Sequence, residues 1–239
     1  MTEKHLRNII AASTSTLFGG EYLDYLMEEI KDLFKDTDDV IFVPYARPGG
    51  ISHDEYTSMA AKAFKKIGKN IIGLHTFENP VSAIQDAGGI FTGGGNTFVL
   101  VRDLYHHGLI EAMREVIFSG TPYLGSSAGS NICGVSIGTT NDMPIVYPPS
   151  FKTMGVLPFN INPHYLDPIP GNRHMGETRE TRIKEFHTQN TIPVVGIREG
   201  SWIRGIGNEF VLKGNLKARI FEYQKNPYEL EPESIISFD

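Results

Sequence analysis

The chain is 239 residues long with 40% hydrophobic and 21% charged residues, which is enough to bury a core without support from disulfides or metal ions. Its 22 Lys and Arg residues are outnumbered by 28 Asp and Glu residues, and the net charge of −6 argues against nucleic acid or an anionic membrane as a partner. The single cysteine, Cys133, excludes an internal disulfide and a cysteine-rich zinc site; we expect it to be a small buried apolar residue. With no apolar stretch of signal-peptide or membrane-spanning length in the sequence, we expect a cytoplasmic protein.

Short apolar runs alternate with segments of helical periodicity through the first half of the chain, which is typical of βαβ units that feed a parallel sheet. The predicted strands are Asn8–Ala12, Val40–Pro44, Asn70–His75, Gly89–Thr92 and Pro122–Ser126. The predicted helices are Tyr22–Phe34, Ser52–Ile67, Val81–Asp86 and Thr97–Ser119, the last one broken at Gly108. The pattern predicts an α/β fold with a doubly wound, mostly parallel sheet between two layers of helices, and ligands beyond the carboxyl ends of the strands.

The pattern changes after the fifth predicted strand. Seven of the chain's 14 prolines fall between Met143 and Pro170, which predicts an ordered loop with short extended pieces. A helix is predicted from about Glu177 to Asn190, and a buried strand at Pro193–Ile197. Antiparallel strands joined by Gly-Asn turns are predicted at Trp202–Ile206, Glu209–Lys213 and Ala218–Tyr223. We expect one domain over residues 1–239, with a loosely packed tail at Pro227–Asp239.

A G-x-S-x-G motif, Gly125-Ser126-Ser127-Ala128-Gly129, follows the fifth predicted strand and precedes a stretch of small residues. In this context the motif places a serine on a strained strand-to-helix turn, and glycines flank it because a Cβ would block close backbone contacts. We therefore predict that Ser127 is a nucleophile, with helix N–H groups beneath it facing a developing oxyanion. The alternative is a turn rich in Gly and Ser without chemistry.

A second glycine-rich turn, Thr92-Gly93-Gly94-Gly95-Asn96, also follows a predicted strand and opens a predicted helix. Its backbone can approach a ligand closely, so its N–H groups are candidates for a second oxyanion donor. The rival interpretation is a nucleotide-phosphate loop. That interpretation is disfavoured because the segment lacks G-x-G-x-x-G spacing and a lysine at the Walker position.

His164 is the candidate general base among the 8 histidines. It follows Asn162-Pro163 in a loop that proline stiffens, and a general base must be held within hydrogen-bond reach of its nucleophile. The alternative is a histidine satisfied by backbone carbonyls. Glu199, at the end of a predicted strand, is the candidate for orienting the imidazole, with Asp142 and Asp167 as competing carboxylates. The order serine, histidine, acid differs from that of α/β-hydrolases, so that fold is disfavoured.

Two arginines fall on the apolar stripe of the helix predicted after Glu177. Arg179 and Arg182 share this stripe with Ile183 and Phe186 at helical spacing. An arginine that faces inward needs an anionic partner, and its planar fork suits a carboxylate. That partner is either a protein acid such as Glu199 or a carboxylate of the substrate, and both alternatives stay open.

Six segments occur in a combination that is far more specific than any one motif. They are Gly93-Gly94-Gly95-Asn96-Thr97-Phe98, Gly125-x-Ser127-Ala128-Gly129, Thr139-Thr140-Asn141-Asp142-Met143-Pro144-Ile145, Ile161-Asn162-Pro163-His164, Gly176-Glu177-Thr178-Arg179-Glu180 and Glu199-Gly200. In these segments, their order and their spacing, the chain resembles the aspartyl dipeptidases of serine peptidase family S51 along nearly its whole length. The resemblance implies a flavodoxin-like sheet related to the class I glutamine amidotransferase fold.

The resemblance also implies roles for individual residues. Ser127 would be the nucleophile, His164 the general base and Glu199 the orienting acid. The backbone N–H groups of Gly95 and Ala128 would form the oxyanion hole. No metal or cofactor is implied.

The family cleaves dipeptides with an N-terminal aspartate. By the same resemblance, Arg179 would bind the aspartyl side chain of such a substrate, while Asn141 and Asp142 are candidates for binding its α-ammonium. We expect a small peptide as the only partner, and a monomer or a homodimer.

The chain departs from the family pattern at two places. Ser126 stands where the family often has tryptophan, which implies a more open pocket wall, and residues 168–175 differ from relatives in length and composition. Two other functions stay open. One is a cyanophycinase-like peptidase for β-linked aspartyl-arginine units, and the other is a non-catalytic module that binds small acids on the same fold.

Overall fold

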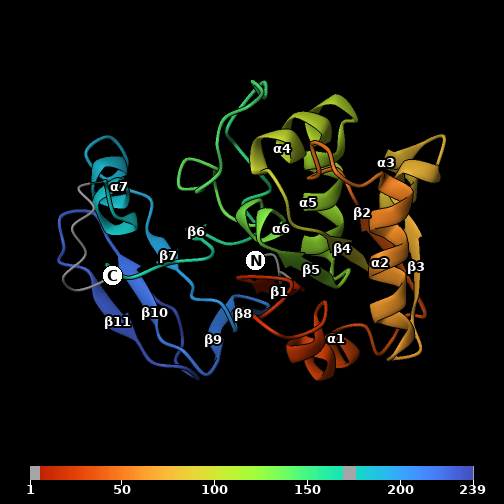
Figure 1. Ribbon diagram of the computed structural model, residues 1–239, viewed down its shortest axis with the longest axis horizontal. Coiled ribbons are helices and arrows are strands. Elements are labelled where there is room, and N and C mark those ends of the chain that lie inside the picture. Colours follow the sequence, from red (N-terminus) through yellow and green to blue (C-terminus); the bar gives the residue numbers. More distant parts are fainter. Residues whose placement is uncertain (1–5, 169–175, 239) are drawn as a thin grey trace, which may run out of the picture.

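Five neighbouring parallel strands form most of a seven-stranded sheet in the computed structural model, which describes residues 6–168 and 176–238 (Figure 1). The strand order is β3-β2-β4-β5-β1-β8-β9. The parallel strands are β1 (Asn8–Ala12), β2 (Asp39–Val43), β3 (Asn70–Gly73), β4 (Ile90–Thr92) and β5 (Tyr123–Ser126). Two antiparallel strands, β8 (Ser201–Ile206) and β9 (Glu209–Gly214), extend the sheet beyond β1.

Side chains alternate between the two faces of this sheet and supply two separate cores. On β1, Ile9 and Ala11 join one core, whereas Ile10 and Ala12 join the other. The first core packs against α3 (Pro80–Gln85), α4 (Thr97–His106) and α5 (Leu109–Ser119). The second packs against α1 (Met27–Leu33) and α2 (His53–Lys65), and Figure 1 shows α1 across the sheet from α4 and α5. The predicted three-layer α/β fold is confirmed.

Short helical turns complete this half of the chain. A 3₁₀ turn, Asp24–Leu26, precedes α1, and a second one, Leu74–Thr76, ends the predicted strand Asn70–His75 early. The predicted break at Gly108 is confirmed, since this residue separates α4 from α5 with φ 67°. Left-handed backbone of this kind favours glycine.

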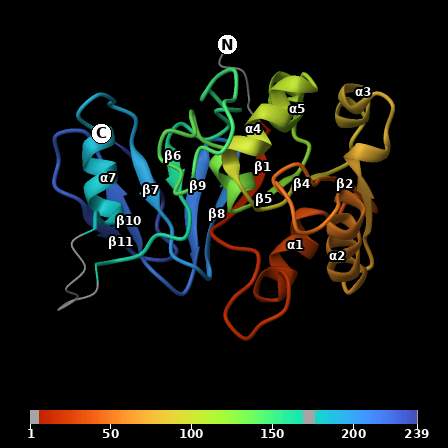
Figure 2. The same cartoon turned by 45° about the horizontal axis from the view of Figure 1, so that its top comes forward.

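A second, four-stranded sheet lies beside the first one and was not expected from the sequence. Its order is β11-β10-β7-β6, visible at the blue end of the chain in Figure 2. Its strands are β6 (Asn160–Asn162), β7 (Val194–Gly196), β10 (Ala218–Phe221) and β11 (Tyr228–Leu230). Helix α7 (Arg179–Phe186) packs on it through Ile183. The strands themselves were predicted, apart from β6 and β11, but their pairing depends on contacts between distant segments.

The C-terminal segment, where a loosely packed tail is expected, makes specific contacts over its described residues. Strand β11 pairs with β10 over three register positions, and beyond it the Ile236 N–H donates to the Phe210 carbonyl at 2.8 Å. Ile236 is buried, and Phe238 packs edge-on against Phe159. The apolar residues Ile235, Ile236 and Phe238 alternate too irregularly with polar ones to signal this packing in the sequence. The segment therefore ties the second sheet to β9 of the first.

The buried ring of Phe91 on β4 gives a test of this core. Its centroid lies 4.9 Å from that of Phe42 and 5.5 Å from that of Phe64. We expect Phe91→Ala to lower the free energy of unfolding by about 3–5 kcal/mol, because it removes a ring and leaves a cavity. Urea denaturation measures the change. The fully exposed Phe18 is the control, and Phe18→Ala should alter stability by less than about 0.5 kcal/mol. Equal effects of the two substitutions would contradict the packing.

Candidate active site

Ser127 occupies a strained turn at the carboxyl end of β5. Its backbone has φ 53° and ψ −109°, and its N–H donates to the Ala12 carbonyl of the neighbouring strand at 3.1 Å. A Cβ on Gly125 would lie 2.4 Å from the Gly129 oxygen, and one on Gly129 would lie 2.2 Å from the Thr92 oxygen. Both glycines are therefore required by close backbone contacts, as the motif predicts.

The helix behind the turn is shorter than expected. Helix α6 covers only Ala128–Asn131, a single turn, so its dipole contributes little. The N–H groups in the first turn of a helix nevertheless have no partner within the helix, and that of Ala128 belongs to this set.

The glycine-rich turn lies directly against the nucleophile. A Cβ on Gly94 would lie 3.0 Å from Ser127 Cβ and 3.6 Å from Ser127 Oγ. Gly95 has φ +147°, and a Cβ there would meet the Ala46 oxygen at 2.2 Å. The turn ends where Asn96 caps α4, with its side chain accepting from the Val99 N–H. The contact with Ala46 therefore admits only glycine at position 95, while the preceding Gly94 lies against Ser127.

His164 links Ser127 to Glu199. The Ser127 Oγ lies 2.9 Å from His164 Nε2, and His164 Nδ1 lies 2.6 Å from Glu199 Oε1. An ionised carboxylate only accepts hydrogen bonds, so Nδ1–H donates to Glu199, and Nε2 of the neutral ring accepts from the serine hydroxyl. This is the arrangement of a general base held in one tautomer by an acid. The structure thus brings together the serine, the histidine and the acid singled out in the sequence.

A buried serine that the sequence analysis missed fixes the histidine loop. Ser13, directly after β1, accepts from the His164 backbone N–H at 2.9 Å and donates to the Ile197 carbonyl at 2.9 Å. His164 itself has φ 53°, which is uncommon outside glycine, and its backbone therefore needs such support. The position of Ser13 after a predicted strand, at the edge where ligands bind, is the signal that could have identified it.

Asn141 supports the same loop from the other side. Its Nδ2 donates to the Pro163 carbonyl at 2.7 Å, and its Oδ1 accepts from Asn162 Nδ2 at 2.9 Å. The side chain is thus engaged within the protein rather than pointing at a ligand.

The two carboxylates that competed with Glu199 serve other partners. Asp142 accepts from the Thr97 N–H at 2.7 Å and from the Thr97 hydroxyl at 2.5 Å, at the first residue of α4. Asp167 accepts two hydrogen bonds from Arg198, both at 2.8 Å. The imidazole therefore meets only one of the three acids that the sequence left in competition.

Arg179 is half-buried at the start of α7 and forms no hydrogen bond or ion pair with any described residue. Burial lowers its pKa from the ordinary value of an arginine; the neighbouring charge of Arg182 lowers it further, and that of Asp142 opposes the shift.

The prediction that Arg182 shares the apolar face is wrong. Its side chain is 56% exposed and lies 3.6 Å from Glu177. Residues three apart in a helix are turned by about 60° from one another, which brings Arg182 to the rim of the stripe while Ile183 stays buried. The helix is also shorter than the predicted Glu177–Asn190.

Two other residues near the nucleophile are buried. Ser126 is fully buried, and its hydroxyl has no hydrogen-bond partner among the described residues. Its small side chain therefore does not form part of an exposed pocket wall. Cys133 is fully buried, as expected, and burial raises the pKa of its thiol far above the ordinary value. Most of the loop at 168–175 lies outside the described residues.

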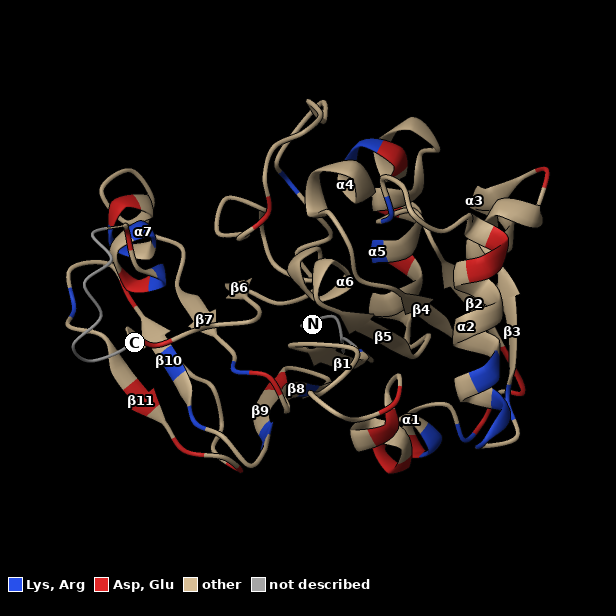
Figure 3. Cartoon of the chain, in the orientation of Figure 1, with Lys and Arg blue, Asp and Glu red and all other residues tan. Residues whose placement is uncertain are grey.

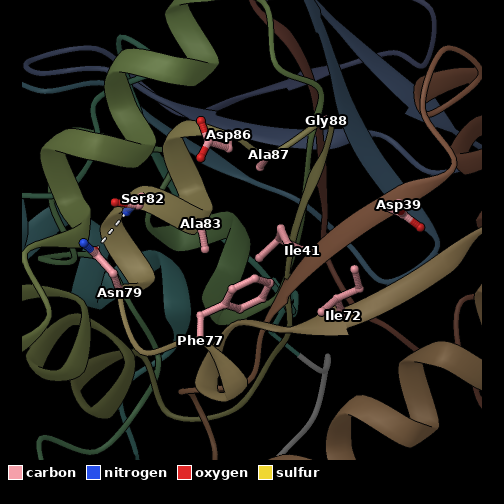
Figure 4. A pocket seen from close by; sticks show the side chains of 10 residues that line it. All are labelled: Asp39, Ile41, Ile72, Phe77, Asn79, Ser82, Ala83, Asp86, Ala87 and Gly88. Carbon is pink, nitrogen blue, oxygen red and sulfur yellow. Dashed lines mark hydrogen bonds between the residues drawn. The ribbon is translucent and has the colours of Figure 1, made fainter.

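A hollow of about 430 Å³ lies away from these residues, between the edge strand β3 and α3 (Figure 4). Apolar side chains such as Ile72 and Phe77 line it together with Asp39 and Asp86. It contains none of the site residues that the sequence predicts.

Other kinds of site find little support in the structure. Over residues 6–168 and 176–238 there is no group of three or more His, Cys, Asp or Glu side chains that could hold a metal ion. No helix in that part of the chain is long and apolar enough to cross a membrane. Charges of both signs are mixed on α2, α5 and α7 alike (Figure 3).

Comparisons with known proteins identify the family of this chain. The family model for peptidase family S51 matches residues 9–213. A probable alpha-aspartyl dipeptidase of Drosophila melanogaster is 45% identical over 235 residues, 97% of each chain. Peptidase E of Streptomyces coelicolor is 44% identical over 230 residues, which cover 96% of this chain and 93% of that protein.

Solved structures show the same fold at lower identity. A peptidase from an acI-B1 actinobacterium superposes with a TM-score of 0.73 over 99% of each chain, at 18% identity. A putative peptidase E protein of Listeria monocytogenes superposes with a TM-score of 0.66, covering 87% of this chain and 98% of that chain, at 20% identity. Taken with the sequence relatives, these findings show that the chain belongs to peptidase family S51.

Proposed function

We propose that this chain hydrolyses dipeptides with an N-terminal aspartate through an acyl-enzyme formed on Ser127. The observation that carries the proposal is the continuous hydrogen-bonded row from Ser127 Oγ through the His164 ring to Glu199 Oε1, at 2.9 and 2.6 Å. The geometry alone supports acyl transfer by a serine. The names of the relatives, alpha-aspartyl dipeptidase and peptidase E, support the reaction and the substrate.

Acylation begins when Ser127 Oγ attacks the scissile carbonyl carbon while its proton passes to His164 Nε2. The C–N bond then breaks, and the proton on Nε2 passes to the departing amine, which leaves an ester on the serine. In the second half, water gives a proton to Nε2 and its oxygen attacks the ester carbon. The Oγ–C bond breaks, Oγ recovers the proton, and free aspartate leaves. Glu199 stabilises the imidazolium that exists during each half.

The backbone amides of Gly95 and Ala128 are the proposed donors to the tetrahedral oxyanion. Gly95 is fixed by its contact with Ala46, and Ala128 is the first residue of α6. Fixed donors need no reorganisation when charge develops, and one such donor typically contributes about 10²–10³ in kcat.

Arg179 is the proposed binding partner of the aspartyl side chain. It is half-buried and has no anionic partner among the described side chains, so a substrate carboxylate can form an ion pair with its guanidinium. Of the two candidates for the α-ammonium, Asp142 fits better than Asn141, because the hydrogen bonds from Thr97 use only Oδ2 of Asp142, whereas the acceptor Oδ1 of Asn141 is already engaged with Asn162. Asp142 also carries the charge that an ammonium group requires.

A panel of dipeptides that vary the first residue tests the reaction. We expect Asp-Leu to be hydrolysed while Ala-Leu and β-Asp-Arg are not, and Ser127→Ala to lose about 10⁴-fold or more in kcat. Ser126→Ala is the matched control, since that neighbouring hydroxyl is buried without a partner and its removal should leave kcat within about twofold of wild type. Chromatography of the released amino acids measures both.

Three results would contradict the proposal in different ways. Preferential release from β-Asp-Arg would indicate a cyanophycinase-like peptidase. Tight aspartate binding without turnover, and without labelling of Ser127 by a fluorophosphonate, would indicate a binding module. Full activity in Ser127→Ala would remove the serine from the mechanism.

Replacement of Arg179 by methionine tests substrate recognition. Methionine keeps much of the bulk but leaves the aspartyl carboxylate unpaired, so kcat/KM for Asp-Leu should fall by about 100-fold or more. An alanine p-nitrophenyl ester, which lacks that carboxylate, should be affected far less. Arg182→Met is the matched control on the exposed side of α7. Equal losses with both substrates would assign Arg179 a structural role.

Three expectations from the sequence stay predictions. A small peptide is the proposed substrate and partner, the assembly is a monomer or a homodimer, and the location is cytoplasmic.

A further inference from the structure

We propose that Arg198 is a positioning residue that clamps the loop of His164 to the strand end that carries Glu199, by way of Asp167. The proposal rests on the function proposed above, because it concerns the alignment of the same three residues. Arg198 directly precedes Glu199, and Asp167 lies three residues after His164. One ion pair therefore joins the two chain segments that supply the base and the acid.

The contacts of Arg198 are unusually complete for a side chain near the surface. Its Nε and Nη2 donate to the two carboxylate oxygens of Asp167, both at 2.8 Å. Nη1 and Nη2 also donate to the carboxylate of Glu229 on β11, at 2.9 and 3.0 Å, and Nη1 donates to the Lys217 carbonyl at 2.6 Å. The guanidinium lies 5.5 Å from the centroid of the Tyr165 ring. Paired forks of this kind fix direction as well as distance.

The site needs such a clamp because its own parts are exposed and strained. The His164 and Glu199 side chains are 35% and 48% exposed, so water competes for their hydrogen bond. The backbone of His164 is also left-handed. By contrast, Arg198 is only 16% exposed, and its hydrogen bond to Asp167 lowers the pKa of that carboxyl, which keeps the pair charged near neutral pH.

Strand pairing explains why the clamp acts on both residues together. Asn162 of β6 is the register partner of Gly196 of β7, so the two strands leave the second sheet side by side. Beyond them, the Tyr165 N–H donates to the Ile197 carbonyl at 3.0 Å. The Arg198–Asp167 ion pair is the next contact along these two segments. It joins the loop that follows β6, which carries His164, to the loop that follows β7.

Asp167→Asn is the decisive variant, because asparagine keeps the size and removes the charge. We expect kcat for Asp-Leu to fall about tenfold with KM within about twofold, since small losses of alignment cost rate rather than affinity. Glu229→Gln is the matched control. It takes one carboxylate charge from the same guanidinium, but on a strand that carries no site residue, so kcat should fall less than about threefold.

Two further measurements separate alignment from folding and from the proposed function. One is the rate of Ser127 labelling by a fluorophosphonate, and the other is the downfield proton signal of His164 Nδ1–H. Both depend on the alignment of Ser127, His164 and Glu199, and neither needs a peptide substrate. Both should weaken in Asp167→Asn and persist in Glu229→Gln, while thermal melting shows that each variant is folded.

The possible results decide the proposal. Equal kcat losses in the two variants, or an Asp167→Asn enzyme with wild-type kcat and labelling rate, would overturn the clamp. A wild-type protein that is labelled at Ser127 but does not hydrolyse Asp-Leu would overturn the proposed substrate, while the labelling rates and the proton signal would still test the clamp.

Discussion

One buried hydroxyl joins the two sheets at the point where the site forms. Ser127 belongs to the end of the seven-stranded sheet, whereas His164 and Glu199 follow strands of the four-stranded sheet. The Ser13 side chain bridges them, since it sits after β1, accepts from the His164 N–H and donates to the Ile197 carbonyl. An unpaired buried polar group is costly, so the Ser13 hydroxyl makes both hydrogen bonds at once. These two bonds fix the loop of His164 and the end of β7 relative to β1.

The arginines near the site differ in whether they have a carboxylate partner. Arg198 has two carboxylate partners, and Arg182 has one. Arg179 is half-buried and has no ion pair with a described residue. Partial burial of an uncompensated cation is unfavourable, and an anionic partner offsets that cost.

Much of this arrangement could be predicted from the sequence, because it depends on local patterns. The elbow around Ser127 and the glycine-rich turn are governed by contacts between near neighbours, so the motif was sufficient. The parallel, doubly wound sheet of the first half follows from the alternation of strands and helices and from the handedness of crossovers. The break at Gly108 likewise needs only one residue that tolerates a left-handed backbone.

The parts that sequence could not predict depend on distant segments. Without the family resemblance, choosing Glu199 over Asp142 and Asp167 requires knowing which strand ends adjoin, since all three acids follow extended or loop segments. The second sheet and the packing of the C-terminal segment are set by pairings of the same kind. The prediction for Arg182 is wrong for a different reason. Helical spacing gives the angle between two residues about the helix axis, but it does not say which side of the helix meets the core.

The central place of β1 also bears on how the protein is made. This strand precedes its partners β5 and β8 in the chain, and those strands end at Ser126 and Ile206. Until these emerge, the apolar faces of β1 have no permanent cover, and long-range pairing of this type is slow. During synthesis, aggregation therefore competes with folding until most of the chain has been made.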